Sequence, residues 1–184
     1  MSENTEQEFA AYTALVELSR QSLAVAKGLP AQIDITPHWS GIGFELLGTK
    51  FVVPMGEVSE MLEVPTYTRL PGVKSWVRGV ANVRGRLLPI FDFASFFGER
   101  LIAPRKQRRI LILETENIYS GLLVDQVYGM QHFPVDTFHE TSNDLPAEVN
   151  KLVEGSYTQT GQEWTVLSPK LLENDDQFMN VAQN

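Results

Sequence analysis

The sequence predicts a mainly β protein made of two fused β-lobes, with one long helix before them and short helices between strands. Three observations carry this prediction. Short runs rich in β-branched and aromatic residues alternate with turns every few positions, which is typical of a barrel or sandwich. The second half of the chain repeats the pattern of the first half. A helical period extends over several turns near the N-terminus.

The N-terminal segment is expected to form an amphipathic helix of about five to six turns. Thr5 and Glu8 have the spacing of a capping box, and apolar residues from Phe9 to Ala26 recur on one side of a helical period. Gly28 and Pro30 are expected to end the helix. We interpret it either as an arm docked on its own domain or as a helix that binds a partner.

A linker of residues 31–40 follows this helix, so that residues 1–41 precede the β-lobes. The pattern then changes to the alternation of a strand, and residues 42–53 read as a hairpin. We expect its turn at Gly48-Thr49, a two-residue connection with glycine first.

The clearest local signal is a second hairpin, in which the apolar runs 77–83 and 87–93 flank Arg84-Gly85-Arg86. Gly85 tolerates the positive φ that a tight reversal needs. The two arginines are therefore not required for the turn, and they are expected to project from its tip.

Two residues of the second strand of this hairpin add further expectations. Pro89 cannot donate to a β-ladder, so we expect the strand to lie at a sheet edge or a bulge. Asp92 is expected to cap a short helix that ends at Gly98.

The two halves of the chain match position by position. Phe44, Val58 and Met61 recur 69 positions later as Leu113, Val127 and Met130. Val77, Gly79, Gly85, Leu88, Ile90 and Phe96 recur 76 positions later as Val153, Gly155, Gly161, Trp164, Val166 and Leu172. Because each copy is too small to bury a good core alone, we expect two packed lobes, at about residues 42–98 and 109–172. The polar tail, residues 173–184, is expected to fray.

Composition narrows the class of function. A net charge of -8 disfavours phosphate-driven binding of nucleic acid or membrane, and the lack of cysteine excludes disulfides and thiolate chemistry. No window approaches the length of an apolar membrane span, and the N-terminus does not resemble a signal peptide. We therefore expect a cytoplasmic protein without direct membrane insertion.

A search for catalytic chemistry finds no convincing site, cofactor motif or metal motif. His132 and His139 lack a carboxylate at ligand spacing, and the glycines near residue 43 do not open a helix. Asp92 and Asp125 are better explained as a helix cap and as an acceptor for backbone donors near a turn. A hydrolase that uses these two carboxylates and a histidine is kept as one alternative.

A second alternative is a small-barrel protein that binds nucleic acid. It would use Arg84, Arg86 and the basic run Arg105–Arg109. No aromatic platform interleaves that run, so a solvated basic loop explains it better and we expect no nucleic-acid partner.

Three motifs occur in an order that resembles the CheW-like adaptor family of bacterial chemosensory systems. They are G-x-x-N-x-R-G-x-x-x-P-I-x-D-F from Gly79 to Phe93, G-L-L-V-D-x-V from Gly121 to Val127, and the Glu-Gly pair at Gly155. The N-terminal extension resembles the branch that serves type IV pilus twitching motility, the PilI-type proteins. The resemblance implies two five-stranded SH3-like barrels around a shared core and no enzymatic activity. It also implies two partners: the cytoplasmic tip of a methyl-accepting chemoreceptor, and the regulatory domain of a CheA-type histidine kinase. Recruitment to membrane-associated receptor arrays follows from these partners.

The family's partner-contacting positions, carried over by motif, fall on Val58, Glu60, Gly79, Asn82 and Arg84. As a hypothesis, Val58 and Glu60 form part of a groove for a receptor helix, and the Arg84 guanidinium anchors a partner's carboxylate or carbonyl. The chain departs from the family at Leu167-Ser168, where members usually carry Leu-Asp, so we expect the second lobe to lack the acidic cap that Asp92 gives the first.

Overall fold

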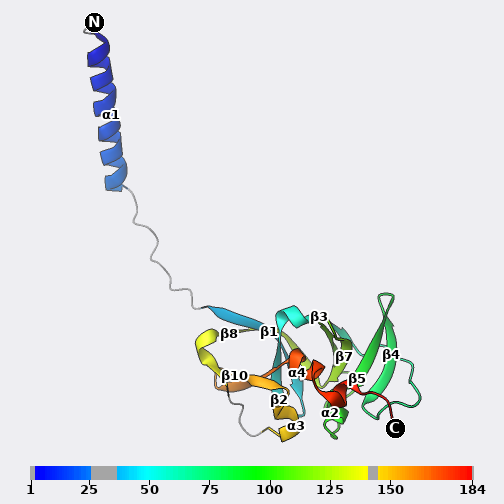
Figure 1. Ribbon diagram of the computed structural model, residues 1–184. Helices are drawn as coiled ribbons and strands as arrows, with labels where there is room; N and C mark the ends of the chain where they lie inside the picture. Colours follow the sequence, from blue (N-terminus) through cyan, green and yellow to red (C-terminus); the bar gives the residue numbers. More distant parts are fainter. Residues whose placement is uncertain (1–2, 26–36, 141–144, 184) are drawn as a thin grey trace. The chain divides into compact units, whose positions relative to one another are not determined.

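The structure is a computed structural model that describes residues 3–25, 37–140 and 145–183, with side chains of the first helix from Tyr12 to Ala24 (Figure 1). It divides into two compact units, Met1–Ile35 and Thr36–Asn184. No helix in the described ranges is long and apolar enough to cross a membrane.

The first unit contains the predicted long helix, α1 (Glu3–Val25). Its described apolar side chains are exposed, with Tyr12 at 67% and Leu23 at 75%. The side chains of the predicted capping box, and the glycine and proline predicted to end the helix, lie outside the described residues. The two interpretations of the helix, docked arm or partner-binding element, both stay predictions.

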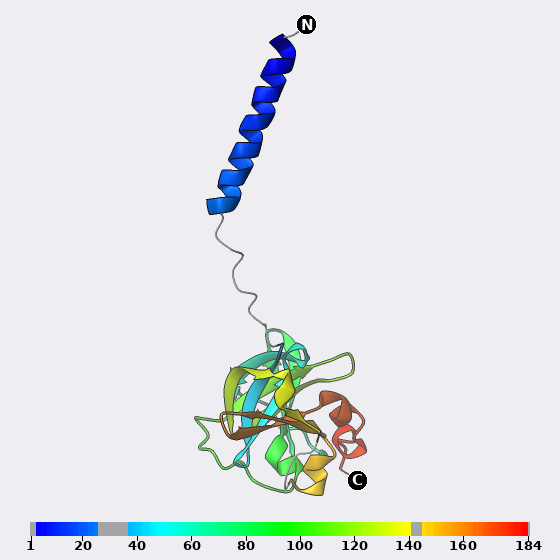
Figure 2. The ribbon, with the colours of Figure 1, turned by 90° about the vertical axis from the view of Figure 1, so that its left-hand side faces the viewer.

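The second unit contains two β-sheets, which confirms the predicted mainly β fold (Figures 1 and 2). One sheet, here called the hairpin sheet, has the strand order β3-β6-β7-β5-β4. Its strands are β3 (Val58–Glu63), β4 (Val77–Val83), β5 (Arg86–Asp92), β6 (Arg109–Glu114) and β7 (Tyr119–Val124). The other, here called the aromatic sheet, has the order β8-β1-β2-β11-β10-β9. Its strands are β1 (His38–Leu46), β2 (Thr49–Pro54), β8 (Gln126–Pro134), β9 (Phe138–His139), β10 (Val153–Gln159) and β11 (Gln162–Leu167).

The two sheets have the same topology, but neither consists of one sequence repeat. Replacing each strand of the hairpin sheet by its counterpart in the other repeat gives β8-β1-β2-β11-β10, the order of the aromatic sheet without β9. The parallel pairs also correspond, since Ile90 pairs with Gly121 and Val166 pairs with Val52. In each sheet, two strands are therefore the first two of one repeat, and three are the last three of the other repeat. This differs from the predicted lobes at residues 42–98 and 109–172, which assume that each copy folds on itself.

Three local predictions differ from the structure: the start of the first strand, the position of the first turn, and the edge position of β5. Strand β1 begins at His38, because His38 pairs with Pro134, so the linker ends before residue 40. The first turn is Leu47-Gly48, since Leu46 pairs with Thr49. Strand β5 is not an edge strand, because it lies between β7 and β4. Of the two places expected for Pro89, the bulge fits better, since the β4–β5 ladder shifts register next to it, between Val77 and Gly79.

Glycine is required where β4 and β10 each meet another segment of chain. At Gly79 (φ +137) an added Cβ would lie 2.0 Å from the carbonyl oxygen of Thr68. At Gly155 (φ +154) it would lie 2.3 Å from the carbonyl oxygen of His139. Both glycines are the third residue of their strand and directly follow a register shift, so the close crossing is part of the repeat.

Two apolar clusters stabilise the unit. The larger contains buried side chains from both sheets, including Phe44, Leu88 and Leu113, each 0% exposed. The smaller contains Val52, Phe133, Tyr157, Trp164 and Val166 of the aromatic sheet. Trp39 of β1 stacks on Tyr157 with a centroid distance of 5.0 Å.

Short helices connect strands, as predicted: η1 (Met55–Glu57), α2 (Phe93–Phe96), η2 (Val135–Thr137) and α3 (Ala147–Asn150). Two more, α4 (Pro169–Glu173) and α5 (Asp176–Met179), follow the last strand. The Asp92 side chain caps α2 by accepting from the Ser95 N–H at 3.0 Å, whereas Ser168 makes no such bond to α4. The expectation that residues 173–184 fray is wrong, because Phe178 of α5 is buried and Val181 and Gln183 hydrogen-bond to the chain near Gly72.

Candidate partner-binding surface

The tip of the β4–β5 hairpin is a two-residue turn formed by Arg84 (φ 52) and Gly85 (φ 82). Both residues have positive φ, so the expectation that Gly85 alone meets the backbone demand of the turn is wrong. Asn82 supports the turn, since its Oδ1 accepts from the Gly85 N–H at 2.9 Å. Of the predicted site residues, Asn82 therefore has a role in shaping the tip.

Arg84 contacts Glu60, another predicted site residue, across the mouth of the barrel. The guanidinium Nη2 lies 2.7 Å from the Glu60 Oε1, with side-chain exposures of 79% and 30%. Strands β3 and β4 are the two edges of the hairpin sheet, so this ion pair links its ends. Because Arg84 is so exposed, the pair contributes little to folding and leaves most of the guanidinium free for a partner.

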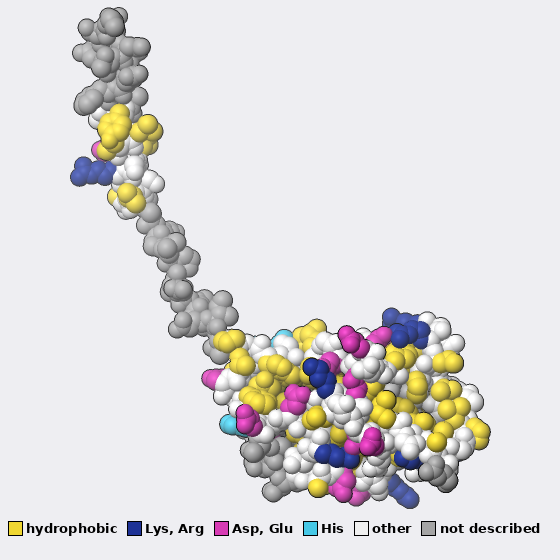
Figure 3. Space-filling view, viewed as in Figure 1, with side chains coloured by type: hydrophobic (Ala, Val, Ile, Leu, Met, Phe, Trp, Pro, Cys, Tyr) yellow, Lys and Arg dark blue, Asp and Glu magenta, His cyan; other side chains and the backbone are white. Residues whose placement is uncertain are grey.

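Arg86, beside the tip, is engaged within the chain. Its guanidinium donates to Glu114 at 2.7 Å and lies 3.7 Å from the centroid of the Tyr119 ring. Hydrogen bonds from Arg86 and then Ser59 hold the pKa of the Glu114 carboxyl below its usual value. Basic and acidic side chains consequently sit side by side at this end of the molecule (Figure 3).

A groove runs between the two sheets, where the equivalent strands β3 and β8 face each other. Its volume is about 400 Å³, and its lining residues are Met61, Leu62, Glu63, Arg109, Val127, Tyr128 and Gly129. Met61 is 43% exposed and Tyr128 is 36% exposed. The Tyr128 hydroxyl donates to Glu45, and this bond, with burial, raises its pKa to about 12. The groove thus offers apolar side chains and one fixed aromatic wall, beside the charged residues Glu63 and Arg109.

The remaining predicted site residues, Val58 and Gly79, lie away from the tip. Val58 pairs with Leu113 and is half-buried against the main core, and Glu60 is also half-buried, as the alternation of β3 predicts. Gly79 sits at the base of β4 under Thr68. The structure therefore brings Glu60, Asn82 and Arg84 together and gives Val58 and Gly79 roles in packing.

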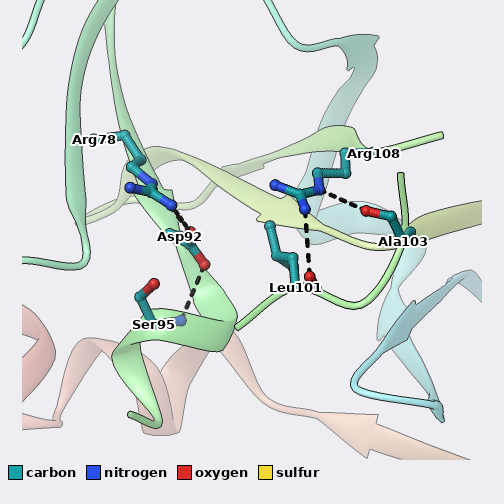
Figure 4. A network of polar contacts seen from close by, with 6 residues as sticks. All are labelled: Arg78, Asp92, Ser95, Leu101, Ala103 and Arg108. Carbon is teal, nitrogen blue, oxygen red and sulfur yellow. Dashed lines mark hydrogen bonds and ion pairs between the residues drawn. The ribbon is translucent and has the colours of Figure 1, made fainter. Parts of the chain in front are cut away.

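The carboxylates of the hydrolase alternative are held in structural contacts. Asp92 is 1% exposed, accepts from Arg78 at 2.5 Å and caps α2 (Figure 4). Asp125 is also 1% exposed and accepts from the backbone N–H groups of Leu47 and Ala103, at 2.9 and 2.7 Å. This confirms their interpretation as a cap and as an acceptor for backbone donors.

Two arginines of the basic run donate hydrogen bonds to backbone oxygens of their own loop. Arg108 donates to the carbonyl oxygens of Ala103 and Leu101, at 2.9 and 3.3 Å, as Figure 4 shows. Arg109 donates to the carbonyl oxygens of Lys106 and Arg108, both at 2.8 Å. These bonds order the loop, and they support its interpretation as a structural feature.

Sequence reasoning missed several residues of this surface. The groove pair Met61 and Tyr128 had one usable signal, since Met61 recurs as Met130 and the repeat therefore places β3 and β8 in equivalent positions. The Arg86–Glu114 contact had none, because the partners belong to strands from different repeats.

A pair of small β-barrels that presents a charged hairpin tip and an apolar groove, with its buried carboxylates in structural contacts, defines a protein-binding module. The model of the CheW-like domain matches residues 40–177, so the chain belongs to the CheW-like family.

Its relatives support this assignment. Protein PilI of Pseudomonas aeruginosa is 50% identical over 171 residues, which cover 93% of this chain and 96% of PilI. Protein FrzA of Myxococcus xanthus is 35% identical over 115 residues, 61% of this chain and 69% of FrzA. The crystal structure of the scaffolding protein TtCheW from Thermoanaerobacter tengcongensis matches with a TM-score of 0.67 at 21% identity, over 79% of this chain and 99% of that one.

Proposed function

We propose that this protein is a non-catalytic adaptor that couples a chemoreceptor to a CheA-type histidine kinase, in a pathway that controls type IV pilus twitching motility. The observation that carries the proposal is that one strand, β3, contributes neighbouring residues to two surfaces. Glu60 pairs with Arg84 of the hairpin tip, and Met61 lines the groove. A bridging protein needs two such surfaces held at a fixed separation.

The hairpin tip is the proposed contact for the regulatory domain of the kinase. Arg84 offers a planar set of donors on an ordered turn, and its pairing with Glu60 at 2.7 Å holds the guanidinium in place before a partner arrives. A partner that uses a carboxylate or carbonyl edge competes with Glu60 for these donors.

The groove is the proposed contact for the receptor tip, a helical hairpin whose apolar positions recur every three or four residues. Methionine at the groove adapts to such a face because its side chain is flexible and polarizable. The Tyr128 ring, held by Glu45, supplies the rigid wall against which one helix packs. Binding there recruits the protein from the cytoplasm to receptor arrays.

Titrating the purified full-length protein against a receptor-tip fragment and a kinase regulatory domain tests the proposal. We expect both fragments to bind, and we expect them to bind together. Met61→Glu should weaken receptor binding by about tenfold or more, because it replaces an apolar contact of the groove with a second carboxylate near Glu63. Met55→Glu is the matched control, since Met55 of η1 is 45% exposed and is not among the groove residues.

The alternatives make different predictions in the same assay. If the wild-type protein binds neither fragment, the adaptor function is contradicted. Retention on an oligonucleotide column that falls steeply with salt would support the nucleic-acid alternative instead.

A further inference from the structure

The C-terminal segment, residues 174–183, here called the C-terminal strap, is anchored on the first-repeat hairpin by one aromatic side chain. Phe178 of α5 is 2% exposed. Its ring lies 5.7 Å from Trp76, 5.1 Å from Phe91 and 5.5 Å from Phe96, measured between centroids. Burying a phenylalanine in such a cluster stabilises the folded strap through apolar burial and aromatic contacts. Figures 1 and 2 both show the strap beside α2.

Backbone hydrogen bonds and one ion pair hold the strap on either side of Phe178. After it, the Val181 oxygen accepts from the Lys74 N–H at 3.0 Å, and the Gln183 N–H donates to the Gly72 oxygen at 2.9 Å. Before it, Asp175 caps α5 and lies 2.5 Å from Lys151. The strap is therefore an ordered part of the fold that is held on both sides of Phe178.

The strap contacts the base of the β4–β5 hairpin on both strands. Trp76 directly precedes β4, and its carbonyl oxygen accepts from the Asp92 N–H at the end of β5, at 2.8 Å. Phe91 pairs with Val77 across the ladder. Phe178 packs on Trp76 and Phe91 together, so it clamps the two strands where the hairpin leaves the body of the protein.

The tip of the same hairpin is exposed and depends on its base for orientation. Arg84 lies at the far end of β4, and the contact that holds it across the barrel is an ion pair in solvent. A change of angle at the base moves the far end of a seven-residue strand by more than it moves the base. The clamp at the base therefore adds to the β5–β7 pairing, and it should constrain the tip more than the exposed ion pair does.

We propose that Phe178 is a positioning residue for the partner-binding tip: by clamping the hairpin base, the C-terminal strap sets the orientation of Arg84. The inference rests on the proposed adaptor function and names a residue that sets the affinity of its kinase contact. Phe178 itself lies in the core and touches no partner. The groove between β3 and β8 does not include the strap, so receptor binding is expected to be independent of it.

The test compares three full-length variants: Phe178→Ala, Phe178→Leu and Met179→Ala. Met179 is the matched control, because it is adjacent and 52% exposed. Each variant is titrated against the kinase regulatory domain and the receptor-tip fragment, and hydrogen exchange is measured for the amides of residues 77–92. Phe178→Ala should lower kinase-domain affinity about tenfold and speed exchange in the hairpin, since a loosened anchor must be ordered on binding.

The other variants define the alternatives. Phe178→Leu should recover affinity to within about threefold, since leucine refills most of the volume, and Met179→Ala should match the wild type. Receptor-tip affinity should change by less than about twofold in all three. Wild-type kinase affinity in Phe178→Ala, or an equal loss for both fragments, would overturn the proposal.

Two outcomes need a second measurement. If Phe178→Ala does not fold, Asp175→Asn loosens the strap while it keeps the ring, and a selective loss of kinase affinity of about threefold is expected; equal affinities for this variant and the wild type would then overturn the proposal. If the wild type binds neither fragment, the adaptor function fails on its own, and the hairpin exchange rates decide whether the strap orders the tip.

Discussion

The hairpin sheet and the aromatic sheet share a backbone plan but differ in the residues placed on it. Each has a glycine crossing at the base of its hairpin, at Gly79 and Gly155, with φ of +137 and +154. Each hairpin ends in a turn with two positive φ values, Arg84-Gly85 in one and Thr160-Gly161 in the other. The strand order is the same as well, apart from β9 at one edge of the aromatic sheet. The backbone therefore distinguishes the two lobes very little, and any difference in what they bind must come from side chains.

The side chains differ most at the hairpins. The first has arginine at the tip, and at its base the partly exposed Arg78 pairs with the buried Asp92 at 2.5 Å. The equivalent base residues of the second are Glu154 and Ser168, and its turn offers no charge. The first hairpin thus combines an internal charge pair with an exposed guanidinium. The comparison shows that the two copies of the repeated unit differ in charge at the hairpin tip, Arg84 in the first and Thr160 in the second.

The two sheets also use a pair of equivalent glutamates in different ways. Glu45 and Glu114 occupy equivalent positions, 69 residues apart. In the hairpin sheet Glu114 bonds Arg86, which lies over Tyr119. In the aromatic sheet Glu45 bonds Tyr128. Both sheets therefore have the carboxylate. It orients the Arg86 guanidinium beside the tip in one sheet and the Tyr128 hydroxyl at the groove in the other.

The largest expected loss of stability concerns the glycine crossings, which the two sheets share. Gly79→Ala should destabilise the protein by about 4 kcal/mol, because the new Cβ would meet the Thr68 carbonyl and the backbone would be strained. Gly155→Ala should cost a similar amount. Gly85→Ala, where nothing lies within 4 Å, should cost only about 1 to 2 kcal/mol. Urea unfolding measures all three, and a Gly79→Ala variant as stable as Gly85→Ala would show that the crossing is not tight.

A smaller effect tests how the hairpin bases differ. Asp92→Ala should destabilise by about 3 kcal/mol, since it leaves Arg78 without its partner and removes the cap of α2. Ser168→Ala, the equivalent change, should cost less than about 1 kcal/mol because Ser168 makes no cap bond. Thermal and urea unfolding of both variants provide the measurement. Equal losses would remove the distinction drawn between the two bases.

The smallest expected effect on stability concerns Tyr128 of the aromatic sheet and occurs only at high pH. Folding raises the pKa of Tyr128 from 10.0 to about 12, so its contribution to stability is complete below pH 10 and is lost as pH rises to about 12. The stability difference between wild type and Tyr128→Phe should therefore shrink across that range. Ser59→Ala, at the equivalent position, should show no such dependence. A constant Tyr128→Phe difference up to pH 12 would mean that the hydroxyl does not bond Glu45.

Local features of the fold could be predicted because their signals are local. Gly79, Gly85 and their counterparts repeat at a constant spacing, and that spacing alone indicates two copies of one unit. The exchange of strands between copies could not be predicted in this way. Phe44 and Leu113 are equivalent, so a pairing within a copy and a pairing between copies bury the same residue types.

The candidate site was predictable to a similar degree. The projection of Arg84 follows from its place in the turn, but its contact with Glu60 depends on the closure of a sheet whose edges are β3 and β4. The strap was missed because residues 173–184 are polar on average, and one buried side chain, Phe178, decides their order. An isolated aromatic residue in a polar tail was the available signal.

The most direct test of the central claim is a titration of Arg84→Ala and Thr160→Ala, equivalent changes at the two hairpin tips, against the kinase regulatory domain. Alanine keeps a Cβ at each positive φ, so neither change should alter folding by more than about 0.5 kcal/mol. We predict that Arg84→Ala weakens binding by about 2 kcal/mol, roughly 30-fold, and that Thr160→Ala binds as the wild type does. Wild-type affinity for Arg84→Ala, or an equal loss for both variants, would contradict the account.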